Sequence, residues 1–313
     1  MHGIQTCAEL RERGWDRDRI DRSPSADGLW GLRGSSGHHE PRRARIAAAL
    51  RAAPAGAVLS GWAAGVVHGI PEPFLDGTSD GDTSLPVGFC VPDKSGAYQR
   101  NGLSLRWSTV APEDVVEVDG HPVTSPSRTV ADLARWHHLP PRALAAVDMG
   151  LRFGLVTPAS LQAVIARMPR RRGIRLLREV APLGTGRSES PKESELRWHW
   201  HEAGLPDPVS NAEIFDLRGN FVARVDVFER GCGYVAEFDG GYHAEGDQPE
   251  LDRQRVAKLE RLNLTVGVFT KEDLRDPLVG GLAGRLRQDH TRARRRDARR
   301  DGWHCPRTRP GER

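Results

Sequence analysis

The stretch FVARVDVFERGCGYVAEFDG, residues 221–240, consists of two runs rich in β-branched and aromatic residues that are joined by a short turn. Runs of this kind on either side of a Gly-Cys-Gly turn favour a β-hairpin. If the turn is centred between Gly231 and Cys232, Asp226 on the first strand lies directly opposite Glu237 on the second. The stretch therefore predicts a hairpin that brings two carboxylates together.

The apolar residues of the two strands agree with this register. Val225 then faces Phe238 and Val227 faces Ala236, all on the face opposite to the two carboxylates. Because side chains alternate between the two faces of a strand, a shift by one residue would bring charged side chains onto the apolar face. We therefore expect this pairing.

Two carboxylates that lie opposite each other on neighbouring strands repel, so they need water, a basic side chain or a cation nearby. Asp239 lies two residues beyond Glu237 and projects from the same face, which adds a third carboxylate. Clustered oxygen ligands suit Mg²⁺ or Mn²⁺. Asp226, Glu237 and Asp239 are therefore the expected metal ligands. The alternative is a solvated outer face on which Arg224 neutralises the acids.

Two further residues are candidates for the chemistry of such a site. His243 follows Asp239 by four residues, and a neutral imidazole there could take a proton from a metal-bound water. Otherwise it is a surface histidine in a Gly-rich turn. Glu193 is a candidate fourth acid, but Ser190-Pro191-Lys192-Glu193 is also a capping box. Helix capping alone would explain Glu193.

A helix expected over 249–262 carries two basic residues, Arg255 and Lys258, that could reach a substrate phosphate. Asp252 precedes Arg255 by three residues, so an ion pair along the helix is the alternative role of this arginine. A buried strand is expected to follow over 264–269.

The pattern upstream of residue 182 is mainly helical. Strands are expected over 87–91 and 103–107, and two short helices followed by these strands suggest a winged-helix arrangement. A break over 182–190 separates this region from the rest of the chain. Apolar periodicity and capping signals predict helices over 42–53, 60–69, 127–135, 142–153, 158–167 and 173–180.

Basic residues are concentrated at the carboxy terminus. The chain has 46 Lys and Arg against 42 Asp and Glu, a net charge of +4. Residues 285–313 hold 11 arginines, no lysine and 4 acidic residues, a net of +7, which leaves −3 for residues 1–284. Such a run can neutralise nucleic-acid phosphates. A solvated, poorly ordered extension is the alternative.

The composition excludes other classes of protein. No run of about 18 apolar residues is present, so no membrane span is expected. Met1–Asp21 lacks the apolar segment of a secretory signal. The four cysteines (Cys7, Cys90, Cys232 and Cys305) are too scattered for a CxxC metal site or a disulfide framework. Reduced thiols point to the cytoplasm.

Several motifs, taken in order, resemble one family. They are SPxESxLR at 190–197, GLP at 204–206, RVD at 224–226, EFDG at 237–240, His243, and DxxR at 252–255. They are similar to the very-short-patch-repair-like (Vsr-like) endonuclease domains of the PD-(D/E)XK nuclease superfamily, over roughly 90 residues. Upstream, Val58–Gly69 and Thr124–Arg135 resemble the antitoxin of AbiE-type toxin–antitoxin systems.

The endonuclease resemblance implies roles for the acidic residues. Asp226 and Glu237 are the expected metal ligands, Glu193 assists from the first helix, and His243 acts as the base. The final Lys of the superfamily motif would fall at position 239, where this chain has Asp239. The very-short-patch-repair branch also lacks that Lys and uses a nearby His. The resemblance implies hydrolysis of a phosphodiester by a metal-activated water.

These observations predict an α/β (α+β) protein with four regions. A winged-helix-like, antitoxin-like region covers 1–110 and a helical middle region covers 111–184. A restriction-endonuclease-like domain with a central mixed sheet covers 185–280, and an Arg-rich disordered tail covers 281–313.

The leading hypothesis is a metal-dependent DNA endonuclease with Mg²⁺ or Mn²⁺ as its cofactor. DNA is the expected partner, a partner protein is expected at the amino-terminal region, and no nucleotide cofactor or membrane is involved. The alternative is a non-catalytic, DNA-binding transcriptional regulator of antitoxin type that retains a nuclease-like scaffold. The joint presence of Asp226, Glu237 and His243 favours the enzyme, since a decayed scaffold has no need to keep all three. An RNA-directed activity is a third option, although no aromatic ladder of the RNP type is present.

Overall fold

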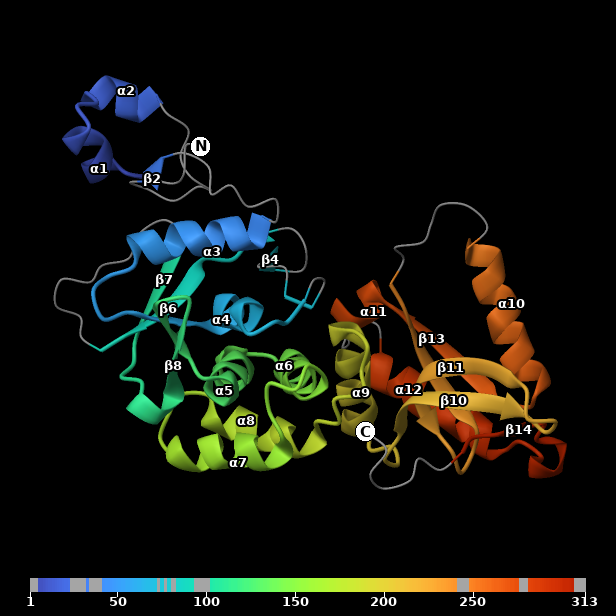
Figure 1. Cartoon of the computed structure of the whole chain (residues 1–313). Coiled ribbons are helices and arrows are strands. Elements are labelled where there is room, and N and C mark those ends of the chain that lie inside the picture. Colours follow the sequence, from blue (N-terminus) through green and yellow to red (C-terminus); the bar gives the residue numbers. More distant parts are fainter. Residues whose placement is uncertain are drawn as a thin grey trace. The chain divides into compact units, whose positions relative to one another are not determined.

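The computed structural model describes residues 5–22, 32–33, 41–71, 74–75, 78–79, 83–92, 102–240, 248–275 and 281–306. The chain folds into two compact units (Figure 1). Unit 1 comprises Met1–Trp136 and Phe153–Ala181, and unit 2 comprises His137–Arg152 and Pro182–Arg313. None of the helices in the described ranges is both long and apolar enough to cross a bilayer. The mixed α/β class expected from the sequence is confirmed, because both units contain helices and a five-stranded sheet.

The main sheet of unit 1 has the strand order β7-β6-β3-β9-β8. Strand β6 is buried along all five residues, as expected for a strand with an apolar sequence and neighbours on both sides. The sheet mixes both directions, because β3 pairs antiparallel with β6 and parallel with β9. The strands are β3 (Val58–Ser60), β6 (Val87–Val91), β7 (Leu103–Trp107), β8 (Val115–Val118) and β9 (His121–Thr124).

The two strands expected in a winged-helix arrangement are confirmed as β6 and β7, but their pairing differs from that of a wing. They run parallel, with Val87 opposite Leu103 and Val91 opposite Trp107. Parallel neighbours need a crossover connection, whereas a wing is an antiparallel hairpin. These two strands therefore do not form a wing. The sequence of each strand does not indicate the direction in which it pairs with a strand elsewhere in the chain.

The helices expected over the amino-terminal half are confirmed within a few residues of their bounds. In unit 1, α5 packs against α4, α7 and α8. Short elements accompany them: α1 (Cys7–Glu12), α2 (Arg17–Arg22), η2 (Pro112–Asp114), η3 (Ala181–Leu183) and the two-residue strands β1 (Gln5–Thr6), β2 (Leu32–Arg33), β4 (Thr78–Ser79) and β5 (Thr83–Ser84). The longer helices are α3 (Pro41–Ala52), α4 (Gly61–Val67), α5 (Pro126–Trp136), α7 (Pro158–Arg167) and α8 (Ile174–Val180).

Unit 2 is built on a sheet with the order β13-β12-β11-β10-β14. The hairpin register predicted from residues 221–240 is confirmed where β11 and β12 are paired: Val227 lies opposite Ala236 and Glu229 opposite Tyr234. Strand β13 then adds to β12 in parallel. The strands are β10 (Val209–Asp216), β11 (Phe221–Glu229), β12 (Tyr234–Asp239), β13 (Thr265–Thr270) and β14 (Trp303–His304).

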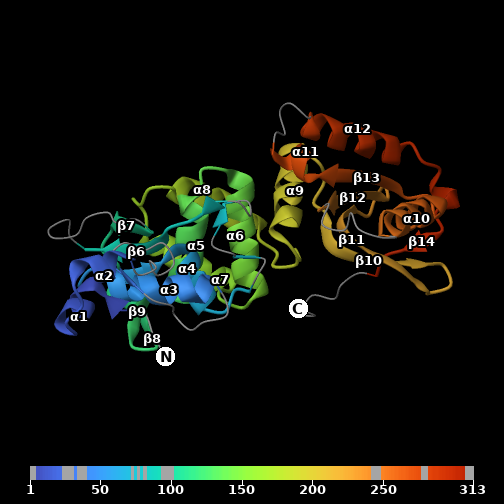
Figure 2. The same ribbon diagram turned by 90° about the horizontal axis from the view of Figure 1, so that it is seen from above.

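Helices cover both faces of this sheet (Figures 1 and 2). One face packs with α9 (Pro191–Glu202), α11 (Lys271–Arg275) and α12 (Leu282–Arg294), around a core that includes Trp200 and Tyr234. The other packs with α10 (Gln248–Arg261) around Val225, Val235 and Leu259. Helix α6 (Pro140–Arg152), which precedes this sheet in the sequence, packs against α9.

The disordered tail expected over 281–313 is a helix and a strand in the described residues 281–306. Leu282, Leu286 and Ala293 of α12 are fully buried in the unit 2 core. Beyond them, η4 (Ala298–Arg300) leads into β14, where His304 pairs with Phe215 of β10. The arginines dominate the composition of this segment, but a sparse stripe of apolar residues at helical spacing determines its structure.

Candidate functional site

Three carboxylates from three elements of unit 2 form the candidate site. Glu193 lies in the first turn of α9, Asp226 on β11 and Glu237 on β12. Glu193 and Glu237 are buried, with 9% and 6% of their surfaces exposed, and Asp226 is half-buried. Acidic residues are seldom buried to this extent without a partner. The partner of Glu237 is Arg255 of α10, which donates a 3.1 Å hydrogen bond to Oε1 and forms an ion pair with Oε2 over 3.0 Å.

The strands are distorted where Asp226 lies. The β10–β11 ladder pairs Ser210 with Val227 and Ala212 with Val225, and Asn211 between them has a left-handed backbone with φ of +49°. Consequently Val225 packs in the core under α10, whereas Val227 packs in the core under α9. The prediction that Val225 and Val227 share one apolar face is therefore wrong.

This distortion changes what the Asp226 carboxylate contacts. Its Oδ2 accepts a 2.8 Å hydrogen bond from the backbone N–H of Phe238 on β12. The regular pairing stops at Val227 opposite Ala236, so the side chain of Asp226 bridges the two strands beyond that point. A carboxylate held by a backbone amide has a fixed orientation, which is a requirement for a metal ligand or a catalytic acid.

Asn211 also orients Glu193. Its side-chain amide donates to Oε2 of Glu193 over 2.8 Å and to the carbonyl of Arg187 over 2.7 Å. The same Glu193 oxygen accepts from the backbone N–H of Glu189 over 2.6 Å. Ser190 caps α9 as predicted, since its hydroxyl accepts from the N–H of Glu193 over 3.2 Å. The Glu193 carboxylate itself contacts residues outside the capping box, so capping does not account for it.

Burial and the charges of neighbouring acids raise the pKa values of Asp226 and Glu237. Burial is the main cause that raises the pKa of Asp226, and the charge of Glu193 raises it further. Burial also raises the pKa of Glu237, with the charge of Asp226 adding to the effect. Arg255 acts in the opposite direction on both. The guanidinium of Arg255 therefore offsets only part of the negative charge of these acids. Excess negative charge of this kind favours the binding of a cation or of a proton.

The remaining predicted site residues are more scattered. Asp239 is exposed at the end of β12, and Lys258 is exposed on α10. His243 lies outside the described residues. Arg224, the predicted neutralising residue of a solvated face, forms an ion pair with Glu189. The structure therefore brings together Glu193, Asp226, Glu237 and Arg255, whereas the predicted ligand Asp239 lies exposed.

Sequence reasoning missed Asp148, which positions the segment before α9. Asp148 is 1% exposed on α6. Its Oδ1 accepts from the backbone N–H of Thr185 and of Gly186 over 2.8 and 3.0 Å. Its Oδ2 accepts from the Ser194 hydroxyl over 2.7 Å and forms an ion pair with Arg197. A lone acid within the apolar run ALAAVDMG, residues 143–150, was the available signal.

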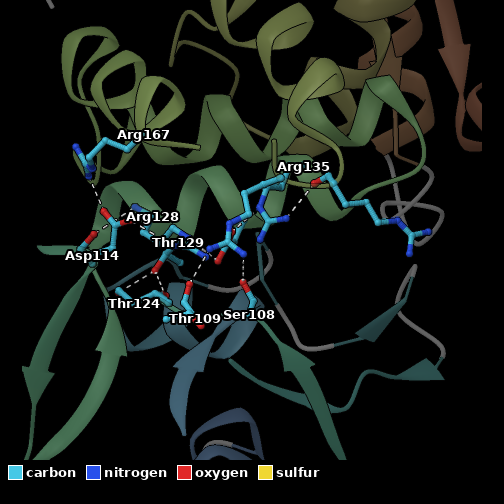
Figure 3. A network of polar contacts seen from close by, with 12 residues as sticks. Ser108, Thr109, Asp114, Thr124, Arg128, Thr129, Arg135 and Arg167 are labelled. Carbon is cyan, nitrogen blue, oxygen red and sulfur yellow. Dashed lines mark hydrogen bonds and ion pairs between the residues drawn. The ribbon is translucent and has the colours of Figure 1, made fainter. Parts of the chain in front are cut away.

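Unit 1 contains a separate buried network of acids and arginines (Figure 3). Asp114 contacts Arg128 over 3.3 Å and also pairs with Arg167. Asp132, fully buried, accepts from Nε of Arg128 over 3.0 Å and from Nε of Arg135 over 2.6 Å. Because each of these acids lies between two arginines, their charges are largely compensated inside the fold. These arginines therefore tie α5 to η2 and α7.

The family model described as the AbiEi antitoxin C-terminal domain matches residues 37–180. This range contains both segments that resembled an AbiE-type antitoxin, so that part of the resemblance is confirmed. Because the match ends at residue 180, it does not include the carboxylates of unit 2, and the endonuclease resemblance stays a prediction.

Two curated proteins of Mycobacterium tuberculosis are similar to this chain, one from strain CDC 1551/Oshkosh and one from strain ATCC 25618/H37Rv. Both are named as uncharacterized proteins. Each is 34% identical over 179 residues, which cover 56% of this chain and 65% of the relative. The chain thus spans 65% of the length of these relatives. No solved structure matches.

Proposed function

We propose that the protein is a nucleic-acid-binding regulator of antitoxin type, whose partner protein is a toxin. The match of residues 37–180 to an antitoxin domain is the observation that carries this proposal. It favours the regulator over the endonuclease, which was the leading hypothesis from the sequence. The buried arginines of unit 1 are already paired with Asp114 and Asp132, so we assign this network to the stability of unit 1 and not to nucleic-acid binding.

The arginines around α12 and η4 supply the surface for nucleic acid. Six of them are exposed on α12, on η4 or between the two: Arg287, Arg292, Arg294, Arg295, Arg299 and Arg300. The buried Leu282 and Leu286 hold this helix on the sheet, so these charges are presented by a folded element. Guanidinium groups gathered in this way neutralise phosphates and release counterions.

Fluorescence anisotropy with a labelled DNA duplex over a salt series tests this proposal. Replacing Arg294, Arg295 and Arg299 together by alanine is expected to weaken binding. The slope of log K against log salt should fall by roughly one for each phosphate that the variant no longer neutralises. The matched control replaces the exposed Arg170, Arg175 and Arg178. Absence of salt-sensitive binding, or an equal loss in the control, would contradict the proposal.

Metal-dependent phosphodiester hydrolysis is a second candidate, favoured by the carboxylate cluster of unit 2. Glu193, Asp226 and Glu237 offer oxygen donors of the type that binds Mg²⁺ or Mn²⁺, and the repulsion between their charges favours a cation near them. When bound, such an ion would supply an activated water and stabilise charge on the phosphate. Glu193 and Asp226 would hold it, oriented by Asn211 and by the Phe238 amide.

Arg255 has two roles in this second candidate. It pairs with Glu237 and also donates to the carbonyl of Arg224, so it fixes α10 beside the acids. Its guanidinium already lies against the cluster, and the residue is partly exposed, so an incoming phosphate could reach it. We infer that Arg255 would exchange Glu237 for the phosphate, which would free a carboxylate for the metal.

Cleavage of supercoiled plasmid with Mg²⁺ or Mn²⁺ separates the two candidates. The Asp226→Asn variant is compared with Glu260→Gln, which alters an exposed acid on α10. Nicking by the wild type and by the control, and its loss in Asp226→Asn, would establish the hydrolase. DNA binding without cleavage by any of the three proteins would leave the regulator as the function.

A further inference from the structure

A cluster of potential metal ligands lies on the other face of the unit 2 sheet. Glu229 ends β11, Cys232 lies in the hairpin turn, and His290 projects from α12. One ligand atom from each, a carboxylate oxygen, the thiol sulfur and a ring nitrogen, all lie within 4.8 Å of one another. These residues are separate from Glu193, Asp226 and Glu237. We propose that Glu229, Cys232 and His290 bind a Zn²⁺ ion that ties α12 to the β11–β12 turn.

The donor types select the metal. A thiolate, an imidazole and a carboxylate are the side chains that bind Zn²⁺ in proteins, and a sulfur ligand disfavours Mg²⁺ and Ca²⁺. Three protein ligands leave the fourth tetrahedral position to water. Cys232 is 4% exposed, so the site would be shielded on one side by the core around Trp200 and Tyr234.

The carboxylate of Glu229 is held in place by the turn. Its Oε1 accepts from the N–H of Gly231 over 2.7 Å, and its Oε2 accepts from the N–H of Cys232 over 2.8 Å. Each carboxylate oxygen can accept more than one bond, so a position for a metal remains on both. Backbone donors that orient a ligand in this way are a common feature of metal sites.

The Cys232 thiol forms a hydrogen bond with the Glu229 carboxylate, which accounts for the contact between these two residues but not for the approach of His290. Nε2 of His290 lies 3.9 Å from Oε2 of Glu229, which is too long for a hydrogen bond. A metal ion shared by all three residues would account for the position of His290 beside the other two ligands.

Cobalt titration of the full chain, freed of any affinity tag and of metal, tests the site. Co²⁺ replaces Zn²⁺ in tetrahedral sites, and a thiolate ligand gives an intense near-ultraviolet charge-transfer band. We expect this band to saturate at one equivalent of Co²⁺ and to disappear when one equivalent of Zn²⁺ is added. Oxygen ligands alone give no such band, so binding at Glu193 and Asp226 would not produce it.

Matched variants identify the ligands. Cys232→Ser and His290→Gln are expected to abolish the band or weaken Co²⁺ binding at least tenfold, whereas Cys305→Ser, which changes a half-buried thiol of the same unit, leaves it unchanged. Zn²⁺ should raise the melting temperature of the wild type and of Cys305→Ser only. Circular dichroism shows whether each variant is folded, and His290→Gln provides the test if Cys232→Ser is not. A wild-type chain without the band, or a band that persists in folded His290→Gln, would overturn the proposal.

Discussion

The side-chain amide of Asn211 donates a 2.8 Å hydrogen bond to the buried carboxylate of Glu193, while the backbone of Asn211 is left-handed at φ +49°. The two features are connected. The left-handed residue interrupts the β10–β11 ladder next to Asp226, and its side chain reaches the first turn of α9. Unusual backbone conformations persist where surrounding contacts hold them, and they are found frequently at functional sites.

Replacing Asn211 separates the effect of the backbone conformation from that of the hydrogen bond. Asn211→Gly loses the bond to Glu193 but tolerates a positive φ, whereas Asn211→Ala loses the bond and also strains the backbone by about 1–2 kcal/mol. We expect the alanine variant to be the less stable by about that difference in urea unfolding. Equal stabilities of the two variants would mean that the left-handed conformation is not retained.

Arg255→Gln is expected to make stability more dependent on pH. The folded-state pKa values of Asp226 and Glu237 are raised, so folding favours their protonated forms. Their contribution to stability is present at low pH and is lost as the pH rises above the unfolded carboxyl pKa of about 4. Arg255 lowers both pKa values, so its removal increases this loss.

The measurement is the free energy of unfolding of Arg255→Gln and of the wild type from acidic to mildly alkaline pH. The deficit of the variant should grow as the pH rises. The control is Arg253→Gln, which changes an exposed arginine on the same helix. A deficit that is constant with pH would show that Arg255 acts through packing alone.

The hairpin of residues 221–240 could be predicted because alternation and turn chemistry are local. Its register follows from the Gly-Cys-Gly turn, and the pairs from Val227–Ala236 to Glu229–Tyr234 agree with it. The same alternation gave the wrong face for Val225, because the strands turn at the left-handed Asn211 so that Val225 and Val227 lie on opposite faces, although the pairing register is the same on both sides of it. A distortion imposed by a neighbouring strand leaves no periodic signal in the distorted one.

The sequence motifs include the three acids that lie near one another in unit 2, but they did not predict the residues that these acids contact. Arg255 was expected to contact Asp252 or a phosphate, and its pairing with Glu237 was not predicted. Asn211 and Asp148 act across 18 and 46 or more positions of the chain, as the bonds to Glu193, Ser194 and Arg197 show. The parallel pairing of β6 and β7, which contradicts a wing, is non-local in the same way.

Asp148 is expected to be among the most sensitive positions of unit 2. Asp148→Asn leaves the buried Arg197 without its counter-ion, which costs about 3–5 kcal/mol when one partner of a buried pair is removed. If this interaction is the cause, the double variant Asp148→Asn/Arg197→Gln should be less destabilised than the sum of the two single variants. Urea unfolding of the four proteins gives the coupling energy. Additive losses would assign the effect to the bonds that Asp148 makes with the backbone of Thr185 and Gly186.

Gly173 permits a close approach between two backbone segments of unit 1. It precedes α8 with φ of +79°, and a Cβ at this position would lie 1.8 Å from the carbonyl oxygen of Arg135. Gly154 has a similar φ of +70° but no atom within 4 Å of the corresponding Cβ position. Gly154→Ala should therefore cost only the backbone strain of about 1–2 kcal/mol. Gly173→Ala must also displace the end of α5, so we expect a loss larger than that of Gly154→Ala by at least about 2 kcal/mol in thermal or urea unfolding. Similar losses for the two variants would show that α8 moves away from Arg135 without cost, and would contradict the tight packing of these two helices.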